Sequence, residues 1–453
     1  MSATSRVPAL APFRVRSFRF QWPADLATSW AFEMETLILG WYVLVETRSV
    51  LMLTVFASLL YIGTLLSPMF GVMGDRIGHR YVLSAMRAVY AALATTLMTL
   101  AFTGALNPVQ VLAIAAVMGL VRPSDTGMRI ALVGETMPAP QLMGAMSIQR
   151  TTQDSARIAG ALTGAGLVAT LGMGPAYSVV ASLYAISVLL TFKTGGSRAA
   201  PNPGADTAGV SAGLRTASGE RETAEAQPQA RFPQTAVAAG DASARPSPWR
   251  DLKEGLAYVR TTPHLLAVMC LAFLFNLTAF PLFHGLLPYV VKEIYRTDQT
   301  GLGYLVASTA FGALLGAIAL SARGGAIRPA RMMIVSCVAW YAMLLAFAYT
   351  QHLASGIAVL MLVGFTQCLC MITMAAMLLR TTDVHFRGRV MGIRMLAVYG
   401  NLPGLLIAGP LIARFGYPIT ATLYCVIGLA FTLLIAVRWR SHLWRLEAPA
   451  NTR

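Results

Sequence analysis

A succession of long apolar stretches constrains the fold of this chain more than any other feature. About 20 apolar residues in a helix cross the ~30 Å hydrocarbon core of a bilayer. Twelve stretches of this length occur, in two sets of six. They fall near residues 21–45, 50–73, 81–104, 108–133, 143–170 and 174–193, and near 264–291, 301–321, 332–350, 355–379, 390–413 and 417–437. This pattern predicts an all-α membrane protein with twelve transmembrane helices in two six-helix bundles.

The composition agrees with a surface that faces lipid. Of the 453 residues, 56% are hydrophobic and 12% are charged, and the mean hydropathy is +0.62. These are too few charges to cover a water-soluble globule of this size. The net charge is +16, but the basic residues lie in loops between apolar stretches rather than on one face. We therefore expect the lipid bilayer as a partner, and no nucleic acid.

The two sets of apolar stretches define the expected domains. Residues 1–194 would form the first six-helix bundle. Residues 195–248 are rich in Ala, Gly, Pro, Ser and Thr and poor in large apolar side chains, so we expect a disordered cytoplasmic linker. Residues 249–453 would form the second bundle, preceded by an amphipathic segment over 249–260.

Basic residues predict the orientation, because cytoplasmic loops of membrane proteins carry an excess of Lys and Arg. Loops on one side of the predicted bundle are rich in arginine, and loops on the other side are nearly free of it. The arginine-rich side, with both termini, is expected in the cytoplasm. The arginines include Arg14, Arg76, Arg87, Arg331, Arg387 and Arg438.

An internal repeat supports two related halves. Residues 145–148 (Ala-Met-Ser-Ile) align with residues 390–393 (Val-Met-Gly-Ile) at an offset of 245, which also carries Gly71 onto Gly316. In carriers built from such parallel repeats, the substrate site lies near the bilayer midplane between the bundles.

A short basic turn joins the second and third apolar stretches, over residues 71–83. Its glycines permit close approach or sharp turns, and its acid can interact with a helix end or an arginine. The alternative is an ordinary basic connector. We expect a cytoplasmic gate formed by Gly71, Asp75, Arg76, Gly78, Arg80 and Glu135. In this gate Asp75 would meet the amino end of the eleventh span near residues 388–392, and Arg76 or Arg80 would reach Glu135.

The turn resembles the loop signature of the major facilitator superfamily, roughly G-x-x-x-D-R-x-G-x-R. Residues 251–260 followed by Pro263, residues 386–392, and residues 119–124 resemble the branch that contains the bacterial enterobactin exporter and macrolide efflux proteins. This resemblance implies a transporter rather than an enzyme. It further implies proton-driven export, as an antiporter, of a small amphiphilic siderophore-like or drug-like compound across the bacterial cytoplasmic (inner) membrane. The alternatives are a lysolipid or other small-molecule carrier, an importer, and a non-transporting membrane sensor.

Ionisable groups inside spans are costly and are rarely kept without a partner or a role. In the first span Asp25, Ser29 and Glu33 share one polar stripe, and Glu35 points away from it. Glu33 lies near the midplane, where burial favours its neutral form and a facing arginine favours its charged form. We therefore expect Glu33 to couple transport to protons, with Asp25 and Asp125 as the next candidates. Glu35 should face the packed interior or lipid.

The predicted substrate cavity collects polar groups from both halves. Its members are Arg122, Arg129, Arg157, Asp154, Asn276 and Asn401. Alternatively, the charges only neutralise one another, Asp154 with Arg157 and Arg122 with Glu33. His284 is interpreted as an interfacial or packing residue.

Other chemistries lack their motifs. No G-x-x-x-x-G-K-[ST] phosphate-binding loop occurs, and no histidine has metal-ligand spacing with Cys or a carboxylate. The sequence therefore predicts no enzyme activity, no cofactor and no metal. The expected partners are a small-molecule substrate and protons.

Overall fold

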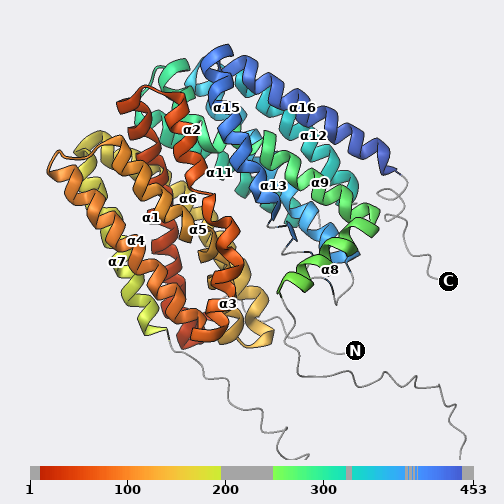
Figure 1. The fold of residues 1–453 in the computed structure, drawn as a ribbon, viewed down its shortest axis with the longest axis horizontal. Coiled ribbons are helices and arrows are strands. Elements are labelled where there is room, and N and C mark those ends of the chain that lie inside the picture. The colour runs from red at the N-terminus through yellow and green to blue at the C-terminus, as the bar shows by residue number, and fades with distance from the viewer. Residues whose placement is uncertain are drawn as a thin grey trace, which may run out of the picture.

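A computed structural model describes residues 11–194, 248–322, 329–382, 386, 390, 393–394 and 396–440 of the protein. Within these residues, all regular elements are helices. The predicted linker (195–248) lies outside them, except for its last residue. Figure 1 shows the helices in two groups that lie side by side.

The helices of the first half follow the first six predicted spans, preceded by the turn η1 (Ala11–Arg14). They are α1 (Arg16–Thr47), α2 (Val50–Leu59), α3 (Ser67–Ile77), α4 (His79–Phe102), α5 (Pro108–Thr136), α6 (Ala139–Leu171) and α7 (Met173–Lys193). The second span is broken into α2 and α3 by the 3-10 turn η2 (Ile62–Leu66). At this break the backbone packs so closely on α5 that a Cβ atom at Gly63 would clash with Leu120.

The second half begins with the predicted amphipathic segment, which is helix α8 (Pro248–Thr261). The helices that follow are α9 (Pro263–Thr278), α10 (Leu287–Tyr289), α11 (Gln299–Ala322), α12 (Pro329–Ala348), α13 (Leu353–Thr381), α15 (Asn401–Phe415) and α16 (Tyr417–Arg438). The seventh span is interrupted by two wide π-helical turns, η3 (Pro281–Gly285) and η4 (Val290–Ile294), and a 3-10 turn η7 (Ala397–Gly400) precedes α15.

The predicted fold class is confirmed. Eight helices in the described part are long and apolar enough to cross a membrane, and Val50–Thr64 forms a shorter apolar helix. Helices α1 and α6 are longer still, at 32 and 33 residues, but both carry ionisable residues along their length. The twelve predicted spans all coincide with helices, although the start of the eleventh lies partly outside the described residues.

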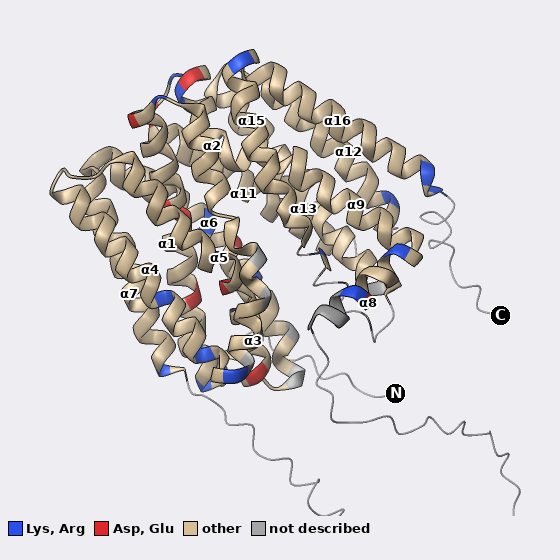
Figure 2. Cartoon of the chain, in the orientation of Figure 1, with Lys and Arg blue, Asp and Glu red and all other residues tan. Residues whose placement is uncertain are grey.

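The halves meet through α6 with α11 and through α2 with α15. Figure 1 shows them close together where α2 lies beside α15 and apart where α3 and α8 lie. We call the latter the basic end, because α3 and α7 end there with Arg76 and Lys193, and Figure 2 shows basic residues gathered at these helix ends. We call the former the far end. Contact at the far end is tight, since a Cβ atom at Gly409 would clash with the Thr54 hydroxyl.

Candidate functional site

A small cavity lies between the halves. The first half contributes a polar wall, with Glu33 and Thr36 from α1 and Arg157 from α6. The second half contributes a mainly apolar wall from η3, α10 and α11. The cavity measures about 80 Å³ in this conformation, well below the roughly 300–1,000 Å³ of sites that bury drug-sized ligands. It is lined by Glu33, Thr36, Leu37, Arg157, Phe283, His284, Leu287, Pro288, Leu302, Val306 and Thr309.

Glu33 and Arg157 form an ion pair on the polar wall of this cavity. Glu33 Oε1 lies 3.5 Å from Arg157 Nε, and the two side chains keep 25% and 34% of their exposure. The alternative pairing of Arg157 with Asp154 is therefore wrong. Asp154 instead pairs with Arg150 at 3.2 Å. Because the Glu33–Arg157 contact is long and both side chains are partly exposed, a ligand can compete for either partner.

Arg122 lies behind the polar wall. Its guanidinium donates a hydrogen bond to Thr36 Oγ1 at 2.7 Å and lies over the Phe32 ring, 4.5 Å from the ring centre. Among the described residues, no carboxylate lies within ion-pair distance of it. The predicted neutralisation of Arg122 by Glu33 is thus wrong, because Arg157 takes that carboxylate.

A separate group of charges is buried in the first half. Asp25 and Asp125 are 3% and 1% exposed. Arg87 binds Asp25, and Arg129 binds Asp125 and also donates to Ser29 Oγ at 2.7 Å. Arg129, predicted to line the substrate cavity, and the two acids are not among the residues that line this cavity. These contacts tie α1, α4 and α5 together.

The buried position of Arg87 was not predicted. Arg87 was expected among the basic loop residues, but it lies inside α4 with no exposed surface. An arginine at the seventh position of the predicted span 81–104 was the available signal. Glu35 does lie in the packed interior, as predicted, where it accepts a hydrogen bond from the Tyr184 hydroxyl at 2.8 Å.

The two asparagines lie outside the cavity. Asn276 is buried and donates to the backbone carbonyl of Ala272 at 2.8 Å within its own helix. Asn401 is 4% exposed at the start of α15. Neither asparagine is therefore among the residues that line this cavity, and their predicted place in the substrate cavity stays a prediction. His284, which was assigned to packing, lines the cavity instead.

The observed contacts at the predicted cytoplasmic gate differ in part from the expected ones. His79 Nδ1 lies 2.6 Å from Glu135 Oε1, and Arg80 donates to the backbone carbonyl of Phe192. The predicted link from Arg76 or Arg80 to Glu135 is thus wrong, because His79, at the start of α4, is closer to the end of α5. Gly78 has φ of +102°, a value that favours glycine. The predicted contact of Asp75 with residues near 388–392 lies outside the described residues, apart from position 390.

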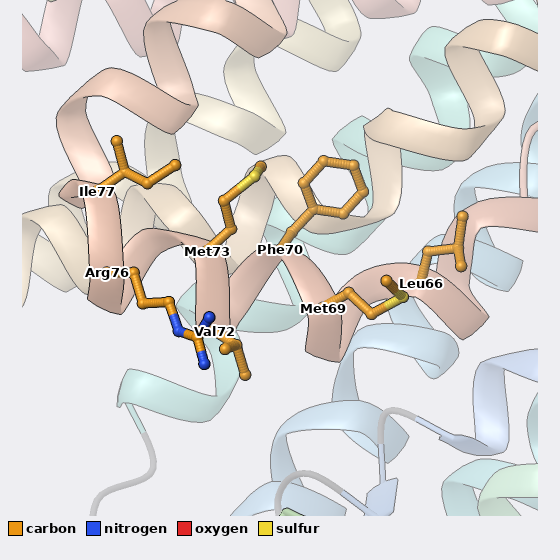
Figure 3. Close-up of a pocket in the computed structure, with 7 residues that line it drawn as sticks. All are labelled: Leu66, Met69, Phe70, Val72, Met73, Arg76 and Ile77. Atoms are coloured by element: carbon orange, nitrogen blue, oxygen red, sulfur yellow. The ribbon is translucent and has the colours of Figure 1, made fainter.

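Helix α3 presents an unpacked apolar face at the basic end. A pocket of about 490 Å³ lies against it, and Arg76 is part of its lining rather than a partner of Glu135 (Figure 3). Gly71, on the same helix, has no atom within 4 Å of where a Cβ would be. This face lies on the side of the molecule where Figure 1 shows the two halves apart. The lining residues are Leu66, Met69, Phe70, Val72, Met73, Arg76 and Ile77.

Solved structures with the same architecture are membrane transporters. The nucleoside transporter NupG superposes with a TM-score of 0.65 at 12% identity, over 95% of this chain and 99% of that one. The human organic anion transporter MFSD10 gives 0.60 at 16% identity, over 95% and 100%. A bacterial homologue of the human lysosomal transporter Spinster, in an inward-facing and unoccupied conformation, gives 0.61 at 12% identity, over 96% of each chain. At these identities the likeness establishes the fold alone.

Comparison at the level of sequence gives the family. No match was found among curated proteins. The family model of the Major Facilitator Superfamily matches residues 26–400, which is most of the chain. The chain therefore belongs to the major facilitator superfamily, whose members are membrane transporters rather than enzymes.

Proposed function

We propose that this protein is a proton-coupled secondary transporter that carries a small anionic amphiphile by alternating access. The observation that carries the proposal is the cavity between the halves, where Glu33 and Arg157 form a partly exposed pair and Arg122 lies nearby without a carboxylate. Two arginines and one carboxylate leave the polar wall with a net charge of +1, which favours an anion.

The two walls of the cavity suit an amphiphile. Arg157 and Thr36 offer charged and polar contacts on one side, and Phe283, Leu287 and Val306 offer an apolar surface on the other. The cavity is smaller than a substrate of the siderophore or drug class, so the halves must separate further around the ligand. A conformation open toward the basic end is the state that would exchange substrate on that side.

Two directions of transport follow from different observations. The resemblance to the enterobactin exporter and macrolide efflux branch favours export by proton antiport. The Glu33–Arg157 pair favours the second candidate, import: an anion that takes Arg157 frees Glu33 to bind a proton, so proton and anion bind together.

The proposed placement follows the arginine distribution. We place the basic end and both termini in the cytoplasm of a bacterium, with the protein in its inner membrane. The bundles 1–194 and 249–453 would then be joined by a cytoplasmic linker over 195–248.

The test is transport by the full-length protein in vesicles. Siderophores, macrolides and dyes, grouped by charge, are compared in vesicles with and without protein under pH gradients of either sign. We expect anionic amphiphiles to accumulate in a gradient-dependent way, and the sign of the gradient distinguishes export from import. A preference for cations would contradict the proposal, transport of lysolipids alone would favour the lipid-carrier alternative, and binding without flux would favour the sensor.

A further inference from the structure

His284 occupies a distinctive position in the seventh membrane crossing. It lies in the π-helical turn η3, which begins at Pro281. Proline removes a helical hydrogen bond, and π-helical turns often occur at functional sites. The turn exposes the His284 side chain to the cavity, whereas its neighbours Phe283 and Gly285 are buried.

Aromatic rings fix the orientation of the imidazole. The ring of His284 stacks on Phe280, with centroids 5.1 Å apart and an angle of 17°, and lies 4.5 Å from the ring of Phe283. Both phenylalanines pack in turn on Trp340, at 5.4 Å and 6.1 Å. The imidazole is thus held in place by packing, without help from hydrogen bonds.

The hydrogen-bonding capacity of this ring is unused within the protein. Among the described residues, His284 has no hydrogen-bond partner, although a neutral imidazole offers one donor and one acceptor. Arg157 lies on the opposite wall of the same cavity.

The second half offers little else that is polar. Of its described residues that line the cavity, Thr309 alone joins His284 in carrying a polar side chain, and its hydroxyl already donates to the Leu305 carbonyl at 3.0 Å. A substrate that spans both walls therefore meets charge on the first half and the free imidazole on the second.

We propose that His284 is a specificity-determining residue, selecting small anions that carry, apart from the anionic group, a hydroxyl or carbonyl able to bond to its ring. This inference rests on the proposed function, because Arg157 and Arg122 hold the anionic group. A site built to hydrogen-bond a substrate group discriminates against analogues that lack it, because a bound analogue that displaces water from the cavity leaves the polar atom of the site unpaired.

The test uses benzoate and its 2-, 3- and 4-hydroxy derivatives, which are small enough for a narrow cavity and vary the distance between the two groups. Binding to the detergent-solubilised full-length protein is measured by titration calorimetry. We expect the best hydroxybenzoate to bind about tenfold more tightly than benzoate. His284→Leu should reduce the affinity ratio of the best hydroxybenzoate over benzoate to about one, and His284→Gln should restore part of it. Thr309→Val, which alters the same wall, is the matched control and should keep the preference.

Two results separate the inference from the proposed function. Equal binding of all four anions by the unmodified protein, or a preference that survives His284→Leu, would overturn the role of His284 alone. If none of the four anions binds, or if Arg157→Gln leaves their binding unchanged, both the role of His284 and the proposed function are overturned.

Discussion

The ammonium of Lys292 lies 3.3 Å from the backbone carbonyl oxygen of Leu44, so the second half holds the end of a helix from the first. Leu44 is in the last turn of α1, where exposed carbonyls carry a partial negative charge. The same oxygen accepts the backbone N–H of Arg48, the αL residue that ends the helix. This contact joins the halves at the far end, beside the tight α2–α15 packing.

Removing this contact should loosen the far end. Lys292→Met takes away a charge worth about 0.3–1 kcal/mol at a helix terminus, which shifts an open–closed equilibrium up to several-fold. We expect faster labelling of a cysteine placed at Thr54, which packs against Gly409, by a membrane-impermeant thiol reagent. Lys292→Arg, which keeps the charge and the donor, should label at the original rate. An unchanged rate in Lys292→Met would show that packing alone closes this end.

Glu33 and Glu35 provide a matched pair for testing coupling. Glu33→Gln cannot change protonation, so it should abolish gradient-driven accumulation while sparing substrate binding and exchange. Glu35→Gln still presents an oxygen to the Tyr184 hydroxyl, so it should alter expression more than coupling. Flux is measured in vesicles with and without a pH gradient. Uphill transport by Glu33→Gln would place the coupling carboxylate elsewhere, with Asp25 and Asp125 as the next candidates.

Arg122 should decide the preference for charge. Arg122→Gln removes a cation that no described carboxylate balances, so affinity for anionic candidates should fall about tenfold or more, with little change for cationic ones. Arg122→Lys keeps the charge but loses the planar set of donors. Its affinity for anions should lie between that of the unmodified protein and that of Arg122→Gln. Both variants are assayed against both classes of compound. Equal losses for anions and cations would make Arg122 a structural residue that supports Thr36 and Phe32.

The buried charge group should contribute strongly to stability. Asp25 is 3% exposed, and Asp25→Asn leaves the buried Arg87 and Arg129 without the carboxylate that they share. Breaking a buried pair by altering one partner costs about 3–5 kcal/mol. Asp154→Asn, whose partner Arg150 has a side chain 72% exposed, should cost about 0–1 kcal/mol. Thermal unfolding in detergent compares the two variants. Similar melting temperatures would mean that Asp25 is solvated or replaceable.

The positions of the membrane-spanning helices could be predicted, because the length and hydropathy of each apolar stretch determine them. The fourth span, predicted over 108–133, is Pro108–Thr136. The breaks at η2 and η3 were not predicted, because an apolar stretch looks the same whether its helix is continuous or interrupted. Gly63 acts through close packing on α5, and such a long-range contact leaves no periodic signal along the chain.

The candidate site was only partly predictable for a related reason. Spacing along one helix suggested that Asp154 would neutralise Arg157, but Glu33 from α1 takes that arginine and Arg150 takes the aspartate. Local spacing cannot rank a neighbour on the same helix against one on another helix. His284 looked like a packing residue because the wide turn that aims it at the cavity depends on the surrounding helices.

The unequal charge of the cavity walls has an electrical consequence. With Glu33 ionised, Glu33 and Arg157 on the cavity wall and Arg122 behind it together carry one positive charge, and a bound monoanion cancels it. Moving one charge through the whole membrane field changes the free energy by about 2.3 kcal/mol per 100 mV. In export by proton antiport, Glu33 would return protonated, so the membrane potential would act on the return of the positively charged empty carrier and leave the anion-loaded step nearly untouched. The resting voltage of the cell would then set how quickly the carrier resets.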